Sequence, residues 1–188
     1  MSKNRYVFST TLEGFINLGE PAGKFNNCSF SFRLTPEVLE QAVQDREELL
    51  DWARTKVDNP KRVALNPEKW DDEGLVKYSF DGDTGRPRPV FVDASGDVVP
   101  VSVLKSAARG TKVKIACQQV PYTKPAMGTT LKVLGVQVVE LVTSNGASDS
   151  GNLSVDDVKN LFGTTEGFKA GAPQVRDDRG AAEDSYDF

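Results

Sequence analysis

The chain has 188 residues, an apolar fraction of 38%, a formal net charge of −4 and no histidine. Without histidine, Ser-His-Asp and Cys-His nucleophile pairs and nearly all zinc sites are excluded. No apolar run approaches the roughly 20 residues that span a bilayer, and the opening MSKNRYVFS lacks the apolar core of a secretory signal. We therefore expect one domain with appendages, without catalysis, cofactor or membrane segment, in the cytoplasm of the cell that makes it.

Charge is unevenly distributed along the chain, and this matters more for the choice of partner than the net value does. Residues 36–56 hold six acids and three bases, whereas residues 84–135 hold eight bases and two acids. The last six residues hold three acids and no base. The sequence thus predicts a basic half of a folded domain, an acidic helix and an acidic end.

Two strands are predicted at the start of the chain. Residues 5–18 form the first, and residues 25–34 form the second, in which apolar and polar residues alternate. Phe30 and Phe32 share the apolar face, so we interpret them as core residues rather than as a base-stacking pair. Arg33, on the opposite face, is a candidate phosphate contact.

A helix is predicted from Thr35 to about residue 57, because a capping threonine followed by proline and glutamate favours a helix N-terminus. The loop 59–74 follows, and its Trp70 is either an exposed stacking residue or a plug at the end of the fold. Short strands are expected after this loop, at residues 75–80, 87–93 and 98–104. The two cysteines, Cys28 and Cys117, have no CxxC partner and are expected to be reduced core thiols.

Five acids in the connecting turns allow one alternative function, a magnesium-dependent nuclease. Such an enzyme needs convergent carboxylates on rigid elements, whereas aspartate in glycine-rich turns serves turn chemistry. The acids are Asp71, Asp72, Glu73, Asp81 and Asp83. We favour the turn interpretation and expect no metal site.

The most informative stretch runs from Thr111 to Leu141 and predicts two strands, each with one apolar face. The apolar phase shifts at Gly135, which predicts a bulge. The turn 121–125 presents a tyrosine and a lysine beside the lysine-rich outer faces of the strands. This is the composition of a base-stacking platform with a cationic lining, although a hairpin whose lysines serve only solubility is the alternative. The candidate residues here are Lys112, Lys114, Tyr122, Lys124 and Lys132.

The composition changes after this hairpin. Residues 143–182 are expected to be a flexible linker, with a short amphipathic helix near 155–162 that docks on the domain or on a second subunit, or binds a partner. The tail 183–188 combines three acids with two aromatic rings and so resembles a short single strand chemically. Tethered to the domain, the tail would compete with nucleic acid for the basic surface, unless it is only a solubilising tail.

Short strands, glycines at bends and one inserted helix predict a mainly β fold. The expected architecture is a five-stranded Greek-key barrel of the OB type over residues 1–142, with one capping α-helix and a flexible acidic C-terminal tail. A β-sandwich is the structural alternative. Lys3 and Arg5, next to the first strand, extend the candidate phosphate path.

Three segments resemble one known family. The opening RYVFST, the stretch FVDASGDVVPV…GTKVKIACQQVPYTKPAMGTTLKVLGVQVVEL and the terminal EDSYDF are similar to the replication single-stranded DNA-binding proteins of short-tailed bacteriophages. The VPY turn and the acidic tail that ends in phenylalanine are the most specific matches. The resemblance covers roughly residues 1–142 and the last residues.

The resemblance implies an OB-fold protein that binds single-stranded DNA without sequence preference in phage DNA replication, recombination and repair, in the bacterial host cytoplasm. It also implies that the tail recruits the replicative DNA polymerase and the helicase-primase, and that a homodimer forms. Tyr122 becomes the stacking residue, while Lys124 replaces a family tryptophan, which strengthens the case for Trp70 or Tyr6. Partner binding is assigned to Glu183, Asp184, Tyr186, Asp187 and Phe188.

The leading hypothesis is therefore a non-catalytic protein that binds single strands. Its candidate contacts are Lys3, Arg5, Arg33, Trp70, Lys112, Lys114, Tyr122, Lys124 and Lys132. The alternatives are an OB-like protein-interaction module or virion component, and the nuclease named above. An OB-type groove can hold several ligand classes, so the fold alone does not choose between them.

Overall fold

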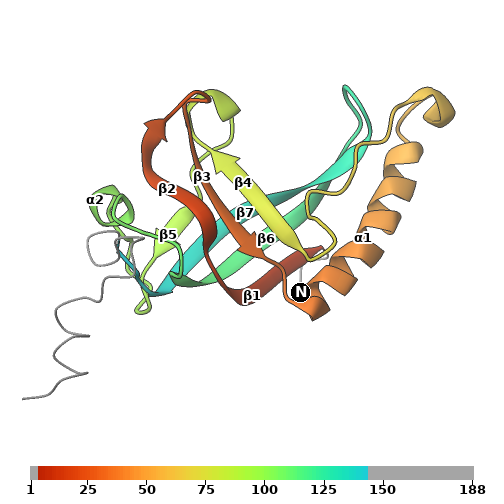
Figure 1. Cartoon of the computed structure of the whole chain (residues 1–188). Coiled ribbons are helices and arrows are strands. Elements are labelled where there is room, and N and C mark those ends of the chain that lie inside the picture. The colour runs from red at the N-terminus through yellow and green to blue at the C-terminus, as the bar shows by residue number, and fades with distance from the viewer. Residues whose placement is uncertain (1–3, 144–188) are drawn as a thin grey trace, which may run out of the picture. The chain divides into compact units, whose positions relative to one another are not determined.

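The computed structural model describes residues 4–143 (Figure 1). The strands in this range are β1 (Arg5–Thr11), β2 (Glu13–Ala22), β3 (Asn27–Arg33), β4 (Leu75–Phe80), β5 (Val90–Val92), β6 (Lys112–Tyr122) and β7 (Gly128–Glu140). The helical elements are α1 (Pro36–Arg54), α2 (Val101–Leu104) and the 3-10 turns η1 (Pro60–Arg62) and η2 (Gly82–Thr84). No helix in residues 4–143 is long and apolar enough to cross a membrane. Lys3, the predicted helix near 155–162 and the tail lie outside the described residues, and the domain boundary at 142 stays a prediction.

The strands form two sheets that together make up one barrel. Sheet A has the order β1-β6-β7-β5, and sheet B has the order β2-β3-β4. β1 and β2 are separated only by Leu12, so one long bent strand belongs to both sheets. β4 leads into β5, which pairs parallel to β7, so a second interrupted strand also passes between the sheets. Counted this way the barrel has five strands, which confirms the predicted OB type rather than a β-sandwich.

Aromatic residues fill the centre of the barrel. Phe30 and Phe32 are fully buried, as predicted, and the Phe30 ring lies 5.7 to 6.4 Å from the rings of Phe32, Tyr78, Phe80 and Phe91. Aromatic rings at these separations pack edge-on or offset and add to the stabilisation that burial provides. Both cysteines are free and buried, as expected. Burial raises the pKa of the Cys117 thiol to about 12.

The predicted bulge at Gly135 is present. Ala116 is paired with Gly135 but the next residue, Cys117, is paired with Val133, so Leu134 is the extra residue of β7. The bulge restores a buried apolar set at Val136 and Val138, and the bend it produces is typical of small barrels. The position of β5 follows from it, because Gly135 is also the partner of Val90.

One predicted helix end and one predicted strand were wrong. The helix α1 begins as expected, with the Thr35 hydroxyl accepting from the Val38 amide at 3.4 Å, but it ends at Arg54 rather than at 57. Residues 98–104 are not a strand: Val98 makes a single bridge to Val92, and the chain then turns into α2. Pro100 immediately precedes α2, and a proline, which lacks a backbone N–H, is suited to the start of a helix and not to a central strand.

The acids considered as metal ligands take part in turns and local bonds. The Asp71 carboxylate accepts hydrogen bonds from the Glu73 and Leu75 amides at 3.0 and 2.8 Å, which lowers the pKa of Asp71. Asp81 pairs with Arg88, and Asp83 accepts from the Asn26 side chain at 3.1 Å. These contacts match the turn interpretation of the sequence.

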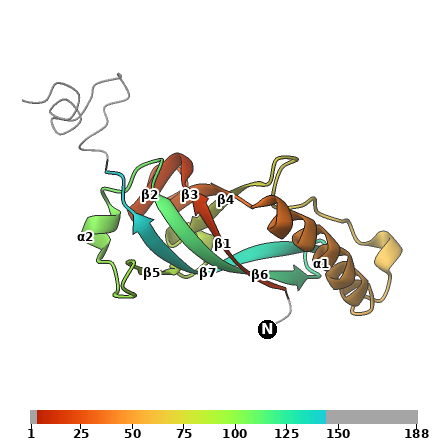
Figure 2. The same ribbon diagram turned by 90° about the horizontal axis from the view of Figure 1, so that it is seen from below.

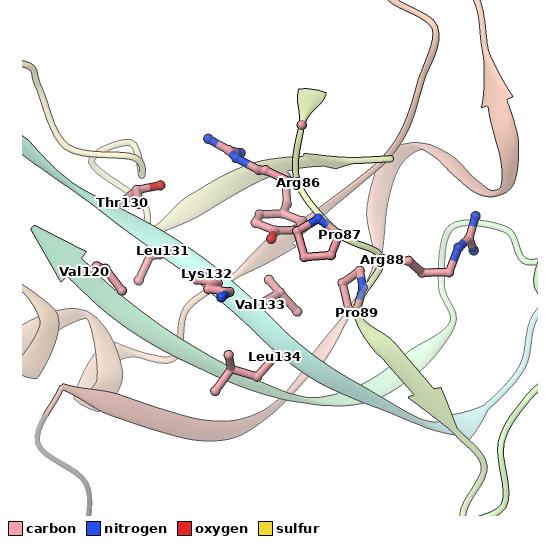
Figure 3. A pocket seen from close by; sticks show the side chains of 12 residues that line it. Arg86, Pro87, Arg88, Pro89, Val120, Thr130, Leu131, Lys132, Val133 and Leu134 are labelled. Carbon is pink, nitrogen blue, oxygen red and sulfur yellow. The ribbon is translucent and has the colours of Figure 1, made fainter. Parts of the chain in front are cut away.

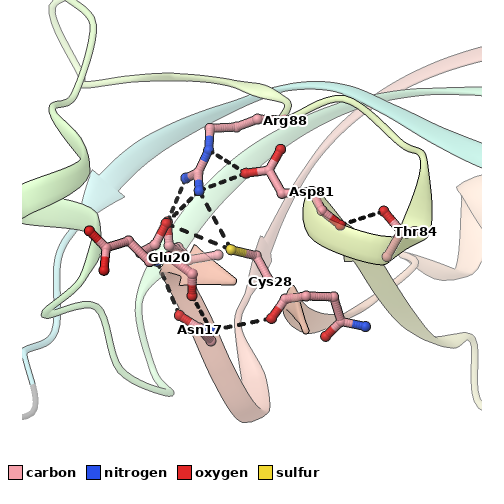
Figure 4. A network of polar contacts seen from close by, with 9 residues as sticks. Asn17, Glu20, Cys28, Asp81, Thr84 and Arg88 are labelled. Atoms are coloured by element: carbon pink, nitrogen blue, oxygen red, sulfur yellow. Dashed lines mark hydrogen bonds and ion pairs between the residues drawn. The ribbon is translucent and has the colours of Figure 1, made fainter. Parts of the chain in front are cut away.

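Arg88 ties together three strands at one end of the barrel (Figure 4). Its guanidinium donates to the Leu18 carbonyl at 2.6 Å, to the Gly19 carbonyl and to the Asp81 carboxylate at 2.8 Å. It also lies 3.5 Å from the Cys28 sulfur, and its planar group sits 5.2 Å from the centre of the Phe80 ring. Arg88 thereby holds the segment after β4 against β2 and β3.

Replacement of Arg88 by methionine keeps most of the side-chain volume but removes every donor. We expect the free energy of unfolding to fall by about 3 kcal/mol, because two carbonyls and one carboxylate lose a charged partner. Urea unfolding followed by circular dichroism measures this change. The matched control is Arg62→Met on the exposed η1 turn, with an expected change within about 0.5 kcal/mol. Equal midpoints for Arg88→Met and the wild type would contradict the role given to Arg88.

Candidate nucleic-acid interface

The outer face of sheet B carries a groove of about 560 Å³. We call it the outer groove; it is lined chiefly by Phe15, Ser29, Ser31, Lys77, Tyr78 and Ser79. Ser29 lies opposite Ser79, and Ser31 lies opposite Lys77, across the β3–β4 pair. Small hydroxyl side chains leave room for a flat group to approach this sheet, and their hydroxyls can donate or accept hydrogen bonds. In OB folds, ligands bind on this face and on the two loops beside it.

Phe15 is the most exposed aromatic residue in this groove, with 79% of its surface accessible. The sequence analysis did not single it out. In the structure Leu12 and Leu18 are buried and Ile16 packs against the core, while register shifts on either side of Asn17 interrupt the alternation of β2. The outward direction of Phe15 therefore does not follow from sequence alternation alone. The preceding residue, Gly14, has φ +66°, a conformation that glycine adopts without strain.

A second exposed ring lies in the loop between β2 and β3. Phe25 is 71% exposed, and the Lys24 ammonium lies 5.8 Å from its ring centre. The sequence pattern predicts Phe25 inside a strand. This is wrong, because Gly23 with φ +76° and Asn26 with φ 40° form a turn there. A ring and a cation therefore stand in one of the two loops that OB folds use for ligands.

Two of the candidate residues from the sequence, Arg33 and Trp70, lie near the outer groove. Arg33 is at the end of β3, but its guanidinium is bound by Glu13 at 3.2 Å and by Glu73 at 2.8 Å, so its charge is already compensated. Trp70 is half-buried and packs against the core, and it shares a surface hollow with Lys77. Trp70 therefore partly fills the end of the fold, which is one of the two interpretations of this residue that the sequence allows.

A separate hollow of about 370 Å³ opens between β4 and β7 (Figure 3). We call it the seam hollow; one wall is the segment Gly85–Pro89 and the other is formed by Val120 and Thr130–Leu134. Tyr78 lines both this hollow and the outer groove. The two hollows therefore meet at β4, the edge strand of sheet B.

The ends of β6 and β7 extend beyond the seam hollow as an arm, which we define as residues 120–130. Val120 lies opposite Thr130, and Tyr122 lies opposite Gly128. The Tyr122 ring packs on this glycine so closely that a Cβ there would come within 2.6 Å of the phenol oxygen. The Asn66 side chain donates to that oxygen at 2.9 Å. Tyr122 is thus half-buried, and Lys124 next to it is exposed.

Helix α1 lies beside the ends of β6 and β7 (Figure 2), and a layer of buried polar side chains joins the helix to the barrel. The Tyr6 hydroxyl donates to Asp45 at 2.6 Å, and Gln119 on β6 donates to Thr129 on β7 at 3.0 Å. Arg46 also donates to Thr129, at 3.4 Å, and to the carbonyl of Asn66 at 2.8 Å. These bonds connect the helix to β1, to Thr129 of the arm and to the segment that contacts Tyr122.

The suggestion that Tyr6 stacks on bases was wrong. Only 6% of Tyr6 is accessible, and its hydroxyl belongs to the polar layer beneath α1. Burial and the hydrogen bond to Asp45 raise the pKa of Tyr6 above its usual value. Tyr6 therefore helps to hold α1 in position against the barrel.

The remaining candidate cations lie on the outer face of sheet A. Lys112 and Lys114 on β6 lie opposite Thr11 and Ser9, and Arg5 lies opposite Gln118. Lys112 is also paired with Glu140 at 2.7 Å. At about 3.3 Å per residue, Lys114 is roughly 26 Å along the strand from Tyr122. The structure therefore does not bring Lys112 and Lys114 together with the tyrosine, whereas Lys132 lines the seam hollow next to the arm.

Comparison with known proteins gives likenesses of structure. No protein-family model and no curated protein sequence matches the chain. The crystal structure of gp2.5, a single-stranded DNA-binding protein encoded by bacteriophage T7, is similar with a TM-score of 0.54 and 19% identity. The match covers 88% of this chain and 99% of that one. At this identity the likeness shows a shared fold.

Two structures of the single-stranded DNA-binding protein of bacteriophage Enc34 are also similar. The C-terminally truncated protein gives a TM-score of 0.47 at 13% identity, over 74% of this chain and 87% of that one. The complex with single-stranded DNA gives 0.47 at 11% identity, over 74% and 88%. The three solved structures named here are all of single-stranded DNA-binding proteins of bacteriophages.

Proposed function

We propose that this chain binds single-stranded DNA without sequence preference and acts in phage DNA replication, recombination and repair, where it protects single strands. One observation carries the proposal. Exposed rings and cations that lack an ion pair among the described residues lie together on the barrel face that OB folds use for ligands. The strand would follow the outer groove, cross β4 and continue along the arm.

The chemistry of this path suits a single strand better than a duplex. Phe15 offers an open face for a base, and stacking on a ring accepts every base because each has a π-face. Lys77, Arg86 and Lys132 line the two hollows, and Lys124 follows on the arm. Lysine and arginine hold phosphates without reading sequence. The fold likeness to the T7 protein, whose name states single-stranded DNA binding, supports the same role here.

The finer role rests on sequence and resemblance. The acidic aromatic tail, residues 183–188, would recruit the replicative DNA polymerase and the helicase-primase, and a homodimer would form. The site of action would be the cytoplasm of the bacterial host, where phage DNA is copied. These partners are part of the proposal, and the tail lies outside the described residues.

The first test is a mobility-shift titration with single- and double-stranded oligonucleotides of equal length at several salt concentrations. We expect the single strand to bind more tightly, with an affinity that falls as salt rises because phosphate contacts release counterions. The double variant Lys77→Gln/Lys132→Gln should lower the slope of log affinity against log salt by about 1.4, at about 0.7 per lost phosphate contact.

The matched control is Lys112→Gln/Lys114→Gln, which removes the same charge from the outer face of sheet A. Its slope should equal that of the wild type. Equal losses in the two double variants would place the strand elsewhere or show only general electrostatics. Absence of any shift at low salt would contradict DNA binding and favour the protein-interaction alternative.

The aromatic contacts are tested separately from the charges. Phe15→Ala should weaken binding of an oligothymidine by about 1–3 kcal/mol, the usual value of one stacked base. Tyr122→Ala should do the same, whereas Tyr122→Phe, which loses only the bond from Asn66, should bind like the wild type. Fluorescence-anisotropy titrations give these constants. An unchanged affinity in Phe15→Ala would remove Phe15 from the path.

Deletion of residues 183–188 tests the tail. We expect the truncated chain to bind single strands more tightly than the full chain, with the larger gain at low salt, because three carboxylates no longer compete for the cations. A variant in which only Tyr186 and Phe188 become alanine separates ring from charge. Identical titrations of truncated and full chains would refute competition by the tail.

A further inference from the structure

The seam hollow exists because β4 and β7 are not hydrogen-bonded to each other as neighbouring strands. Among the strands of residues 4–143, β7 pairs with β5 only at Gly135–Gln137, and the one strand paired with β4 is β3. The segment between them contains Pro87 and Pro89, which have no backbone N–H to donate to a ladder. Arg88 between the prolines is turned into its own network with β2 and Asp81. The opening is therefore built into the chain and is held at a set width.

Tyr78 spans this opening. Burial raises the pKa of Tyr78, and the backbone of Val133 near its phenol oxygen opposes this rise. In a strand, residues two apart direct their N–H and C=O groups to the same side. Leu131 therefore also directs its backbone donor and acceptor toward the hollow. A polar edge of a bound group would find partners there without any side-chain readout.

The walls combine an apolar surface with two cations. Pro87, Val120 and Leu134 contribute apolar surface, while Arg86 stands on one wall and Lys132 on the other (Figure 3). The Arg86 guanidinium lies 5.7 Å from the Tyr78 ring centre. Neither cation makes an ion pair within residues 4–143. Such an arrangement fits a flat group that carries anionic groups on both sides.

We propose that the seam hollow binds one nucleotide of the single strand, with its base inside and its two neighbouring phosphates at Arg86 and Lys132. This deepens the proposed function and rests on it. A phosphate alone would leave the apolar walls unused, and an acyl chain would leave the cations unused. The volume of about 370 Å³ is near the lower end for ligand pockets, so the site takes one base rather than two. The strand would thus be fixed at one point between the outer groove and the arm.

The test fills the hollow without changing charge. Val120→Phe places a ring between the walls, and Val7→Phe on the outer face of sheet A, where Val7 is 62% exposed, is the matched control. Both full-length variants and the wild type are titrated with an oligothymidine and with an abasic oligonucleotide of the same length. Val120→Phe should weaken binding of the oligothymidine by at least about fivefold, the lower value for one stacked base, and leave abasic binding unchanged.

Each outcome separates the two proposals. If the wild type binds neither oligonucleotide, the proposed function fails. If it binds and Val120→Phe equals the wild type, or loses equally on both oligonucleotides, the base site is overturned while DNA binding stands. A melting curve reports whether Val120→Phe folds. If it does not, photocrosslinking of the wild type to an oligonucleotide with 5-iododeoxyuridine decides: adducts in 85–89 or 131–134, which line the seam hollow and not the arm or the outer groove, support the site, and their absence there overturns it.

Discussion

The path proposed for the strand depends on how the chain is held as it leaves β4. Arg88 binds carbonyls of β2 and the carboxylate of Asp81, so the segment that follows β4 cannot drift toward β7. The prolines on either side of Arg88 prevent it from joining β7 as a ladder. An anchored but unpaired segment leaves an opening that a fully closed barrel would lack. The same arrangement places Arg86 at the rim of the opening.

The other side of the path depends on buried polar groups as well as on apolar packing, in which Leu50 and Ala53 of α1 meet Met127 of the arm. Asp45 and Arg46 are adjacent on α1 and almost fully buried, and each is bonded to groups on other elements. A buried charged group left without partners costs several kcal/mol. The helix is therefore held in the one position in which Asp45 and Arg46 keep their partners. This helix position determines where the segment carrying Asn66 lies, and the Asn66 side chain donates a hydrogen bond to the phenol oxygen of Tyr122. The arm can therefore present its ring and Lys124 in a defined place although it extends from the barrel.

Much of the barrel could be predicted from local pattern. The alternation in β3, the capped start of α1 and the phase change at Gly135 each depend on neighbours in sequence. The candidate site was harder to predict from the sequence. Its residues come from β2, β4, the segment Gly85–Pro89 and the arm, and only the fold brings these together. The sequence did not show that Glu13 and Glu73 pair with Arg33, which had been a candidate phosphate contact. It also did not show that Tyr6, a candidate stacking residue, is buried and bonded to Asp45. The exposure of Phe15 depends on the register shifts of β2, and the position of the seam hollow depends on which strand edges stay unpaired.

Pairing of charge explains how a chain with net charge −4 can accept a polyanion on one face. On the described residues, Arg33 and Lys112 are compensated by carboxylates, and a phosphate would have to displace those acids. Lys77, Arg86 and Lys132 face no such competition within this range. Lys114 also lacks an ion pair there, but its cross-strand neighbours are Ser9 and Gln137 rather than exposed rings. Acidic partners thus compensate some of the cations away from β4. Within residues 4–143, cations without a carboxylate partner lie beside aromatic residues around β4, and also beside Phe25 in the β2–β3 loop and Trp52 on α1.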